Sequence, residues 1–71
     1  MANHVTKLER DMLWQYAYPR VRINEKGEAT TDIQALAADI ETRFKVSHSR
    51  ALGAVYRAIR KHRYQMIQAR S

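Results

Sequence analysis

The sequence predicts a mainly α-helical fold of three helices, at about residues 6–18, 32–45 and 49–69, with a short β-hairpin or ordered loop at 20–31. Two observations predict it. Apolar residues recur every three to four positions in the three helical segments, which is the spacing of one helix face. A residue able to cap a helix N-terminus precedes each segment, and the only proline, Pro19, follows the first.

The first helix is framed by its capping residues and by Pro19. Thr6 and Glu9 have the spacing of a capping box, in which a hydroxyl and a carboxylate satisfy free N–H groups of the first turn. Four apolar residues predict its buried face: Val5, Leu8, Met12 and Tyr16. Trp14 and Tyr18 lie on nearly the opposite side. Either the following loop folds back over them, or they form a surface for a second copy or a protein partner.

Residues 20–31 have the features of a turn between helices. Arg20–Asn24 alternates polar and apolar side chains, as a strand does, and Gly27 can take the positive φ of a tight turn. Ala29–Thr31 is long enough to return as a second short strand. A hairpin and an ordered loop are both compatible with this pattern.

The second and third helices have the clearest amphipathic patterns. Asp32 suits the N-terminus of the second helix, where a carboxylate meets the positive end of the helix dipole. Ser47 or Ser49 suits the N-cap of the third. The apolar face of the second helix comprises Ile33, Leu36, Ala37, Ile40 and Phe44. The apolar face of the third comprises Leu52, Val55, Tyr56, Ile59 and Met66.

Composition narrows the class of protein. A chain of 71 residues forms a single domain, 1–71, and it has no cysteine for disulfides, so helix packing or a homodimer must stabilise it. His4, His48 and His62 lack partners at metal-ligand spacing, so we expect neither metal nor cofactor. No signal peptide or membrane-length apolar run is visible, which predicts a cytoplasmic protein without a membrane partner. Catalytic motifs are missing too, so we do not expect an enzyme.

The charge is distributed unevenly along the chain. Residues 1–41 contain five Lys or Arg and all seven acids, whereas residues 42–71 contain eight Lys or Arg and no acid. The net charge of +6 therefore arises entirely in the C-terminal part. Solvated helix faces usually mix in Glu and Asp for ion pairs between neighbouring turns. Their absence favours a polyanionic partner, with DNA as the first candidate.

The segment 32–62 carries the clearest functional pattern. Its apolar positions flank a tight turn at 45–47: Leu36, Ala37, Ile40 and Phe44 before it, and Leu52, Val55 and Ile59 after it. This arrangement resembles the helix-turn-helix unit of small phage and plasmid regulators, although Glu41 and Lys45 stand near positions where that family has a small residue and a glycine. The resemblance implies a DNA-binding transcriptional regulator whose second helix, starting near Ser49, enters the major groove.

A projection of the third helix at about 100° per residue gives the candidate contacts. Basic and polar residues fall opposite its apolar face: Arg50, Arg57, Lys61, Tyr64 and Gln68, with Arg60 beside them. The candidate nucleic-acid contacts are Lys45, Ser47, His48, Ser49, Arg50, Arg57, Arg60 and Lys61. Gly53 costs about 1 kcal/mol relative to alanine inside a helix. It permits close approach of the second helix or of a nucleic acid, or it is simply tolerated.

Three other interpretations remain open. Arg20, Arg22 and Asn24 ahead of two helices are similar to ribbon-helix-helix repressors, which implies that Arg20 and Arg22 contact DNA from a ribbon or loop. A phage or plasmid protein that binds and inhibits a host protein, such as RNA polymerase or a defence nuclease, would use Trp14 and Tyr18. RNA is a further candidate partner, although few aromatic residues are placed for base stacking.

Overall fold

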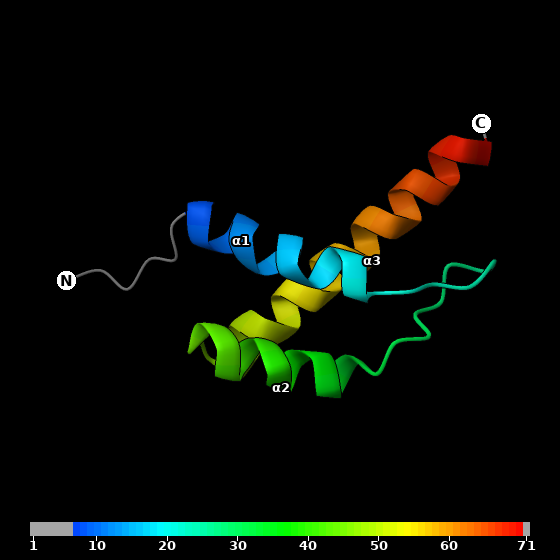
Figure 1. The fold of residues 1–71 in the computed structure, drawn as a ribbon. Helices are drawn as coiled ribbons and strands as arrows, with labels where there is room; N and C mark the ends of the chain where they lie inside the picture. The colour runs from blue at the N-terminus through cyan, green and yellow to red at the C-terminus, as the bar shows by residue number, and fades with distance from the viewer. Residues whose placement is uncertain (1–6, 71) are drawn as a thin grey trace.

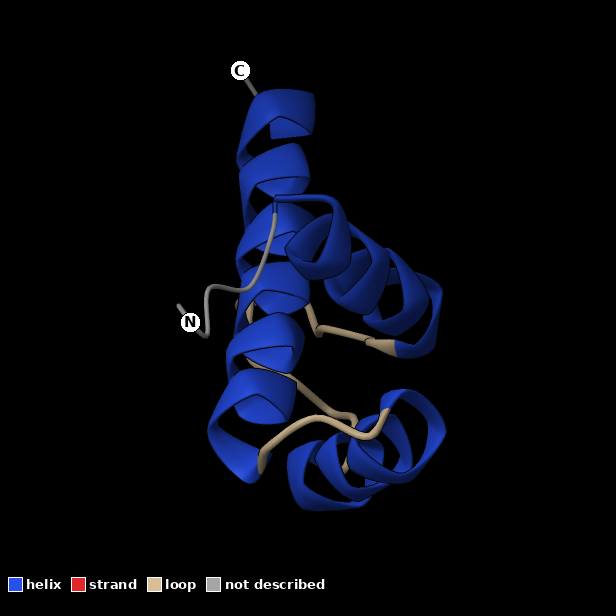
Figure 2. Cartoon of the chain, turned by 90° about the vertical axis from the view of Figure 1, so that its left-hand side faces the viewer, coloured by secondary structure: helices blue, strands red, loops and turns tan. Residues whose placement is uncertain are grey.

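The computed structural model describes residues 7–70, which form three α-helices and one short 3₁₀ turn. α1 spans Lys7–Ala17, η1 Tyr18–Arg20, α2 Ile33–Phe44 and α3 His48–Arg70. α3 runs the length of the molecule, with α1 and α2 packed against it (Figure 1). Both shorter helices lie to the same side of α3 (Figure 2). The predicted mainly helical fold is confirmed, and each described helix end lies within one residue of the predicted one.

The helix ends follow the capping residues of the sequence. The Asp32 carboxylate accepts a hydrogen bond from the Ala35 N–H at 3.0 Å, which caps α2. The Ser47 hydroxyl accepts from the Arg50 N–H at 3.3 Å, so Ser47 and not Ser49 caps α3. α2 ends at Phe44, and the next residue, Lys45, caps it in the left-handed conformation with φ 56°. The predicted capping box of the first helix begins at Thr6, outside the described residues.

The segment between η1 and α2 is an ordered loop. Within the described residues it forms no β-strand, and a single antiparallel bridge joins Ile23 to Ala29. The Asn24 side chain accepts hydrogen bonds from the Lys26 and Glu28 N–H groups, and Gly27 has φ 82°. Of the two predicted alternatives the loop is therefore right and the hairpin wrong. Next to the bridge, the Arg22 N–H donates to the Thr31 hydroxyl and not to a backbone carbonyl, so the pairing does not extend into a ladder.

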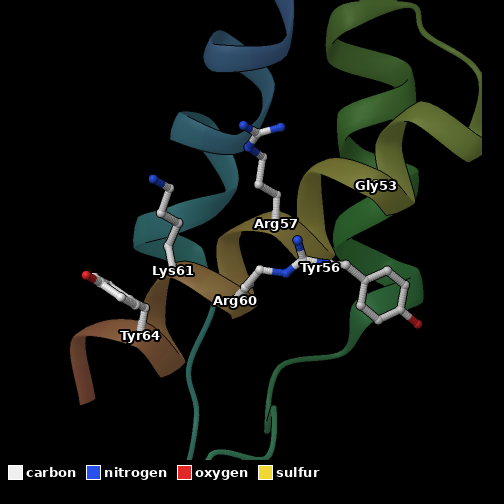
Figure 3. Close-up of a pocket in the computed structure, with 6 residues that line it drawn as sticks. All are labelled: Gly53, Tyr56, Arg57, Arg60, Lys61 and Tyr64. Carbon is white, nitrogen blue, oxygen red and sulfur yellow. The ribbon is translucent and has the colours of Figure 1, made fainter. Parts of the chain in front are cut away.

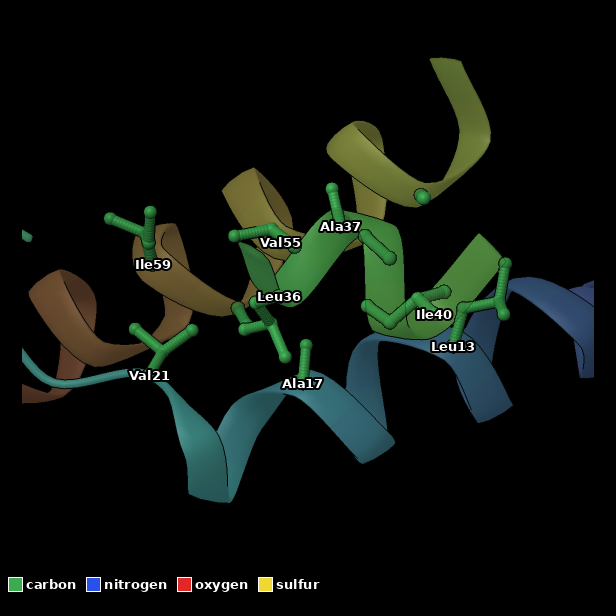
Figure 4. Packing of buried hydrophobic residues seen from close by; sticks show 11 residues of the cluster. Leu13, Ala17, Val21, Leu36, Ala37, Ile40, Val55 and Ile59 are labelled. Carbon is green, nitrogen blue, oxygen red and sulfur yellow. The ribbon is translucent and has the colours of Figure 1, made fainter. Parts of the chain in front are cut away.

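The core lies where α1 and α2 meet the first half of α3. It consists of Leu13, Ala17, Val21, Leu36, Ala37, Ile40, Ala51, Ala54, Val55, Ala58 and Ile59 (Figure 4). Three alanines occupy the buried side of α3, and small residues at a helix contact let the backbones approach closely. The helices are therefore held together by closely packed alanines as well as by larger aliphatic side chains.

Three predicted core positions are wrong, two on α1 and one on α3. Val5, which is predicted for the same face of the first helix, lies outside the described residues. Leu8 and Met12 of α1 are 69% and 47% exposed, while Leu13 and Ala17 are buried in their place. Tyr56 of α3 is 52% exposed. The physical reason is the same in both helices. The helix faces that carry alanine are buried, because small side chains let the helices pack closely. A prediction based on the largest apolar side chains therefore chooses the wrong residues.

Trp14 and Tyr18 are half-buried and pack against α3. The Tyr18 ring stacks on His62 with 4.0 Å between ring centroids, and His62 Nε2 lies 2.7 Å from the Tyr18 carbonyl oxygen. Trp14 packs edge-on against Tyr18 and donates through Nε1 to Asp11, while Lys61 Nζ lies 5.0 Å from the Trp14 ring centroid. The ring and hydrogen-bond contacts of this pair are therefore made with α1 and α3. These contacts extend the fold along α3, beyond the reach of α2.

Candidate nucleic-acid interface

The exposed face of α3 forms an open hollow on the side away from the core. Its lining residues follow one another at spacings of one, three or four, as one helix face requires: Gly53, Tyr56, Arg57, Arg60, Lys61 and Tyr64 (Figure 3). The hollow has a volume of about 610 Å³. No carboxylate lines it. We call it the helix-face hollow.

The cations of the helix-face hollow are mostly free of partners within residues 7–70. Arg57 and Arg60 make no hydrogen bond or ion pair in that part of the chain, and Lys61 makes only its contact with the Trp14 ring. Tyr56 and Tyr64 are 52% and 61% exposed, so their hydroxyls face solvent. The hollow thus offers charged and neutral donors to a ligand rich in acceptor oxygens.

A second hollow opens beside the first, between α1 and α3. It is lined by Arg10, Leu13, Arg50, Gly53, Ala54 and Arg57, with a volume of about 210 Å³. We call it the interhelical hollow. Three guanidinium groups surround a floor of apolar atoms, and Gly53 and Arg57 belong to both hollows. The two hollows make one continuous cationic surface across α1 and α3.

Arg10 is a surface residue that the sequence analysis missed. Its position would have followed from the correct orientation of α1, because Arg10 lies three residues before the buried Leu13 and hence on the same side of the helix. The periodicity of the large side chains instead predicts a core face through Leu8 and Met12, which are exposed. The charge balance of residues 1–41 also concealed Arg10, since acids elsewhere in that segment outweigh it.

Some of the predicted nucleic-acid contacts near the start of α3 are engaged within the fold, and others lie on the cationic surface. Lys45, Ser47, His48 and Ser49 are all exposed. His48 Nδ1 lies 2.6 Å from a Glu41 carboxylate oxygen, so its imidazole turns towards α2. The Ser47 hydroxyl is engaged as a helix cap. The structure therefore gathers Arg50, Arg57, Arg60 and Lys61 on one surface, while His48 and Ser47 have partners within the fold.

Arg20 and Arg22 are engaged within the fold near η1. The Arg20 guanidinium lies 3.7 Å from the Tyr16 ring centroid and donates to the Tyr16 carbonyl oxygen at 2.8 Å. Arg22 donates to the Pro19 carbonyl oxygen at 3.1 Å. The loop backbone also bonds to itself, from Asn24 N–H to Glu28 oxygen and from Thr30 N–H to Arg22 oxygen. This segment does not present the free strand that a ribbon-helix-helix protein pairs with a second copy.

Other kinds of site receive no support from the described residues. Between residues 7 and 70 no three His, Asp or Glu side chains come together in a way that would hold a metal ion. None of the helices there combines the length and the apolar character that crossing a membrane requires. Comparison of the chain with protein-family models, with curated proteins and with solved structures found no match.

Proposed function

We propose that this protein binds duplex DNA through the exposed face of α3 and acts as a small transcriptional regulator. The helix-face hollow carries the proposal, because Arg57, Arg60 and Lys61 line it without any carboxylate. An unpaired cluster of this kind repels itself, and the repulsion is relieved when phosphates bind. Duplex DNA offers regularly spaced phosphates and a major groove about 12 Å wide, which admits an α-helix.

The packing of α2 on α3 supports a helix-turn-helix mode of binding. Ala37 and Ile40 of α2 share one core with Ala51 and Val55 of α3, and only residues 45–47 separate the two helices. Lys45 takes the left-handed conformation that a glycine most easily adopts at the end of a helix. In this mode the N-terminal residues of α3 meet the base edges in the major groove, the exposed cations that follow meet the phosphates beside it, and the turn and α2 lie against the backbone.

The proposal is tested by removing the charges of the helix-face hollow together. The triple variant Arg57→Ala/Arg60→Ala/Lys61→Ala is expected to bind a labelled duplex at least about a hundredfold more weakly than the wild type, since each lost phosphate contact removes roughly a tenfold factor. The expected thermal stability is close to that of the wild type, because all three side chains are exposed. The measurement is fluorescence anisotropy, paired with a thermal melt by circular dichroism.

Two comparisons make this test decisive. Lys7→Ala/Lys26→Ala, which removes charges from α1 and from the loop outside both hollows, is expected to weaken binding far less. Duplex DNA and single-stranded RNA of matched length are titrated side by side. Equal affinity of the triple variant and the wild type for DNA would contradict the proposal, and so would a clear preference for the RNA.

A second candidate, binding to a host protein, is favoured by one observation. Met12 of α1 is exposed and lines an apolar hollow of about 130 Å³, together with Glu9, Leu13, Phe44 and Val46. Leu8, four residues earlier on the same helix, is exposed as well. This surface replaces the Trp14 and Tyr18 pair, whose rings pack on α3 and on each other. Met12→Lys separates the two candidates, because it is expected to abolish capture of a protein partner while leaving DNA binding intact.

A further inference from the structure

Gly53 lies where the two cationic hollows meet. It lines both of them, together with Arg57. It also lies within α3, between the half-buried Leu52 and the buried Ala54, and it is itself exposed. A glycine at such a place lowers helix stability, because it gives up more backbone entropy on folding than any other residue.

The fold itself does not require a glycine at this position. A Cβ atom built on Gly53 meets nothing within 4 Å, and its φ is not positive. Close approach of α2 therefore does not explain why this position is a glycine. Gly27 is the contrasting case, because its φ of 82° and the nearby Met66 and Arg63 side chains explain it without reference to a ligand.

The side chains around Gly53 are cationic and are chemically suited to a phosphate. Arg10 approaches from α1 and Arg57 from α3, and Arg50 lies one turn before Gly53 in the same hollow. Guanidinium groups pair with phosphate oxygens through two parallel hydrogen bonds. Leu13 and Ala54 supply an apolar floor, where a charge-assisted hydrogen bond is stronger than in open water.

We propose that one backbone phosphate of duplex DNA sits over Gly53, between Arg10 and Arg57, and that the missing side chain allows this approach. The inference rests on the proposed function and adds to it a contact from α1. A phosphate held from two helices fixes the position of α3 along the duplex, which a contact from α3 alone does not. Arg10 is then a positioning contact that discriminates little between sequences.

The test uses Arg10→Gln, Gly53→Ala and the double variant, each titrated against a labelled mixed-sequence duplex. Arg10→Gln is expected to bind about tenfold more weakly and to lower the salt slope by about one. Gly53→Ala is expected to melt at a higher temperature than the wild type and yet bind about tenfold more weakly. The double variant is expected to lose little more than either single one, because both changes remove the same contact.

Lys26→Gln is the matched control, a single charge removed from the loop outside both hollows, and it is expected to bind nearly as the wild type does. Gly53→Leu extends the steric series and is expected to bind more weakly than Gly53→Ala. Wild-type affinity in Arg10→Gln and Gly53→Ala overturns the inference, and so do fully additive losses in the double variant. If those two variants bind normally while Arg57→Ala/Arg60→Ala/Lys61→Ala does not, only this inference fails. If the wild type does not bind DNA, both fail.

Discussion

Charged residues have different roles in two regions of this small protein, the segment from α1 to α2 and the exposed face of α3. Around α1, the loop and α2, several polar side chains are engaged with one another: Tyr16 donates to Asp39, Arg20 packs on Tyr16, and Asn24 donates to Glu28. Along the exposed face of α3, Arg57 and Arg60 have no such partners within residues 7–70. The comparison separates charges that organise the fold from charges that remain free for a ligand.

The same contrast exists between the two sides of α3. Its buried side is made of alanine, valine and isoleucine, packed against α1 and α2. Its exposed side carries arginine, lysine, tyrosine and one glycine. Because the two sides are chemically distinct, substitutions on one should change stability and substitutions on the other should change binding. The following predictions test that separation, beginning with the largest expected effect on stability.

Truncation of the buried side should give the largest loss of stability. Ile40 of α2 is fully buried in the core. Ile40→Ala is expected to lower the free energy of unfolding by about 2–5 kcal/mol, because apolar burial is lost and a cavity is left behind. Urea denaturation followed by circular dichroism measures it. The paired exposed variant Arg57→Ala is expected to change stability by less than about 0.5 kcal/mol. Comparable losses of stability in the two variants would contradict the distinction between buried residues, which set stability, and exposed residues of α3, which set binding.

Enlargement of an alanine on the same side should give an intermediate loss. Ala58 is fully buried on α3, and Ala58→Leu is expected to cost about 1–3 kcal/mol, because the close helix contact cannot accept the added atoms. Ala69, which is exposed near the end of α3, supplies the matched control, since Ala69→Leu should leave the melting temperature almost unchanged. An unchanged melting temperature in Ala58→Leu would contradict close packing of α3 at Ala58.

The smallest effect on stability is expected at Lys45, in the turn between α2 and α3. The same substitution is expected to raise stability and to weaken DNA binding. Lys45 has φ 56°, which costs a residue with a side chain roughly 1 kcal/mol relative to glycine. Lys45→Gly is therefore expected to stabilise the fold by about that amount while weakening DNA binding, because one cation is lost. Lys45→Asn keeps much of the conformational preference without the charge and separates the two contributions. Tighter DNA binding by Lys45→Gly would exclude Lys45 from the interface.

The helices could be predicted from the sequence because their signals are local. Pro19, Asp32 and Ser47 mark helix ends through the geometry of the adjoining backbone, and these ends were found within one residue. The orientation of α1 could not be predicted, because it depends on which face of another helix it meets. Leu8 and Met12 are larger than Ala17, yet Ala17 is buried.

The candidate site could be predicted in part for the same reason. Arg57, Arg60 and Lys61 follow from the periodicity of α3, which a projection captures. Arg10 required the packing of α1, and the engagement of His48 by Glu41 required the position of α2 relative to the start of α3. Contacts between elements distant in the sequence depend on tertiary packing, which residue spacing does not specify.

The salt dependence of duplex binding tests the central claim most directly. Each phosphate contacted by a Lys or Arg contributes about −0.9 to the slope of log K against log salt concentration. The wild type is expected to show a steep negative slope, and Arg57→Ala/Arg60→Ala/Lys61→Ala a slope shallower by about 2 to 3. Identical slopes for the two proteins, or binding by the wild type that does not depend on salt, would contradict the claim that the exposed face of α3 binds DNA.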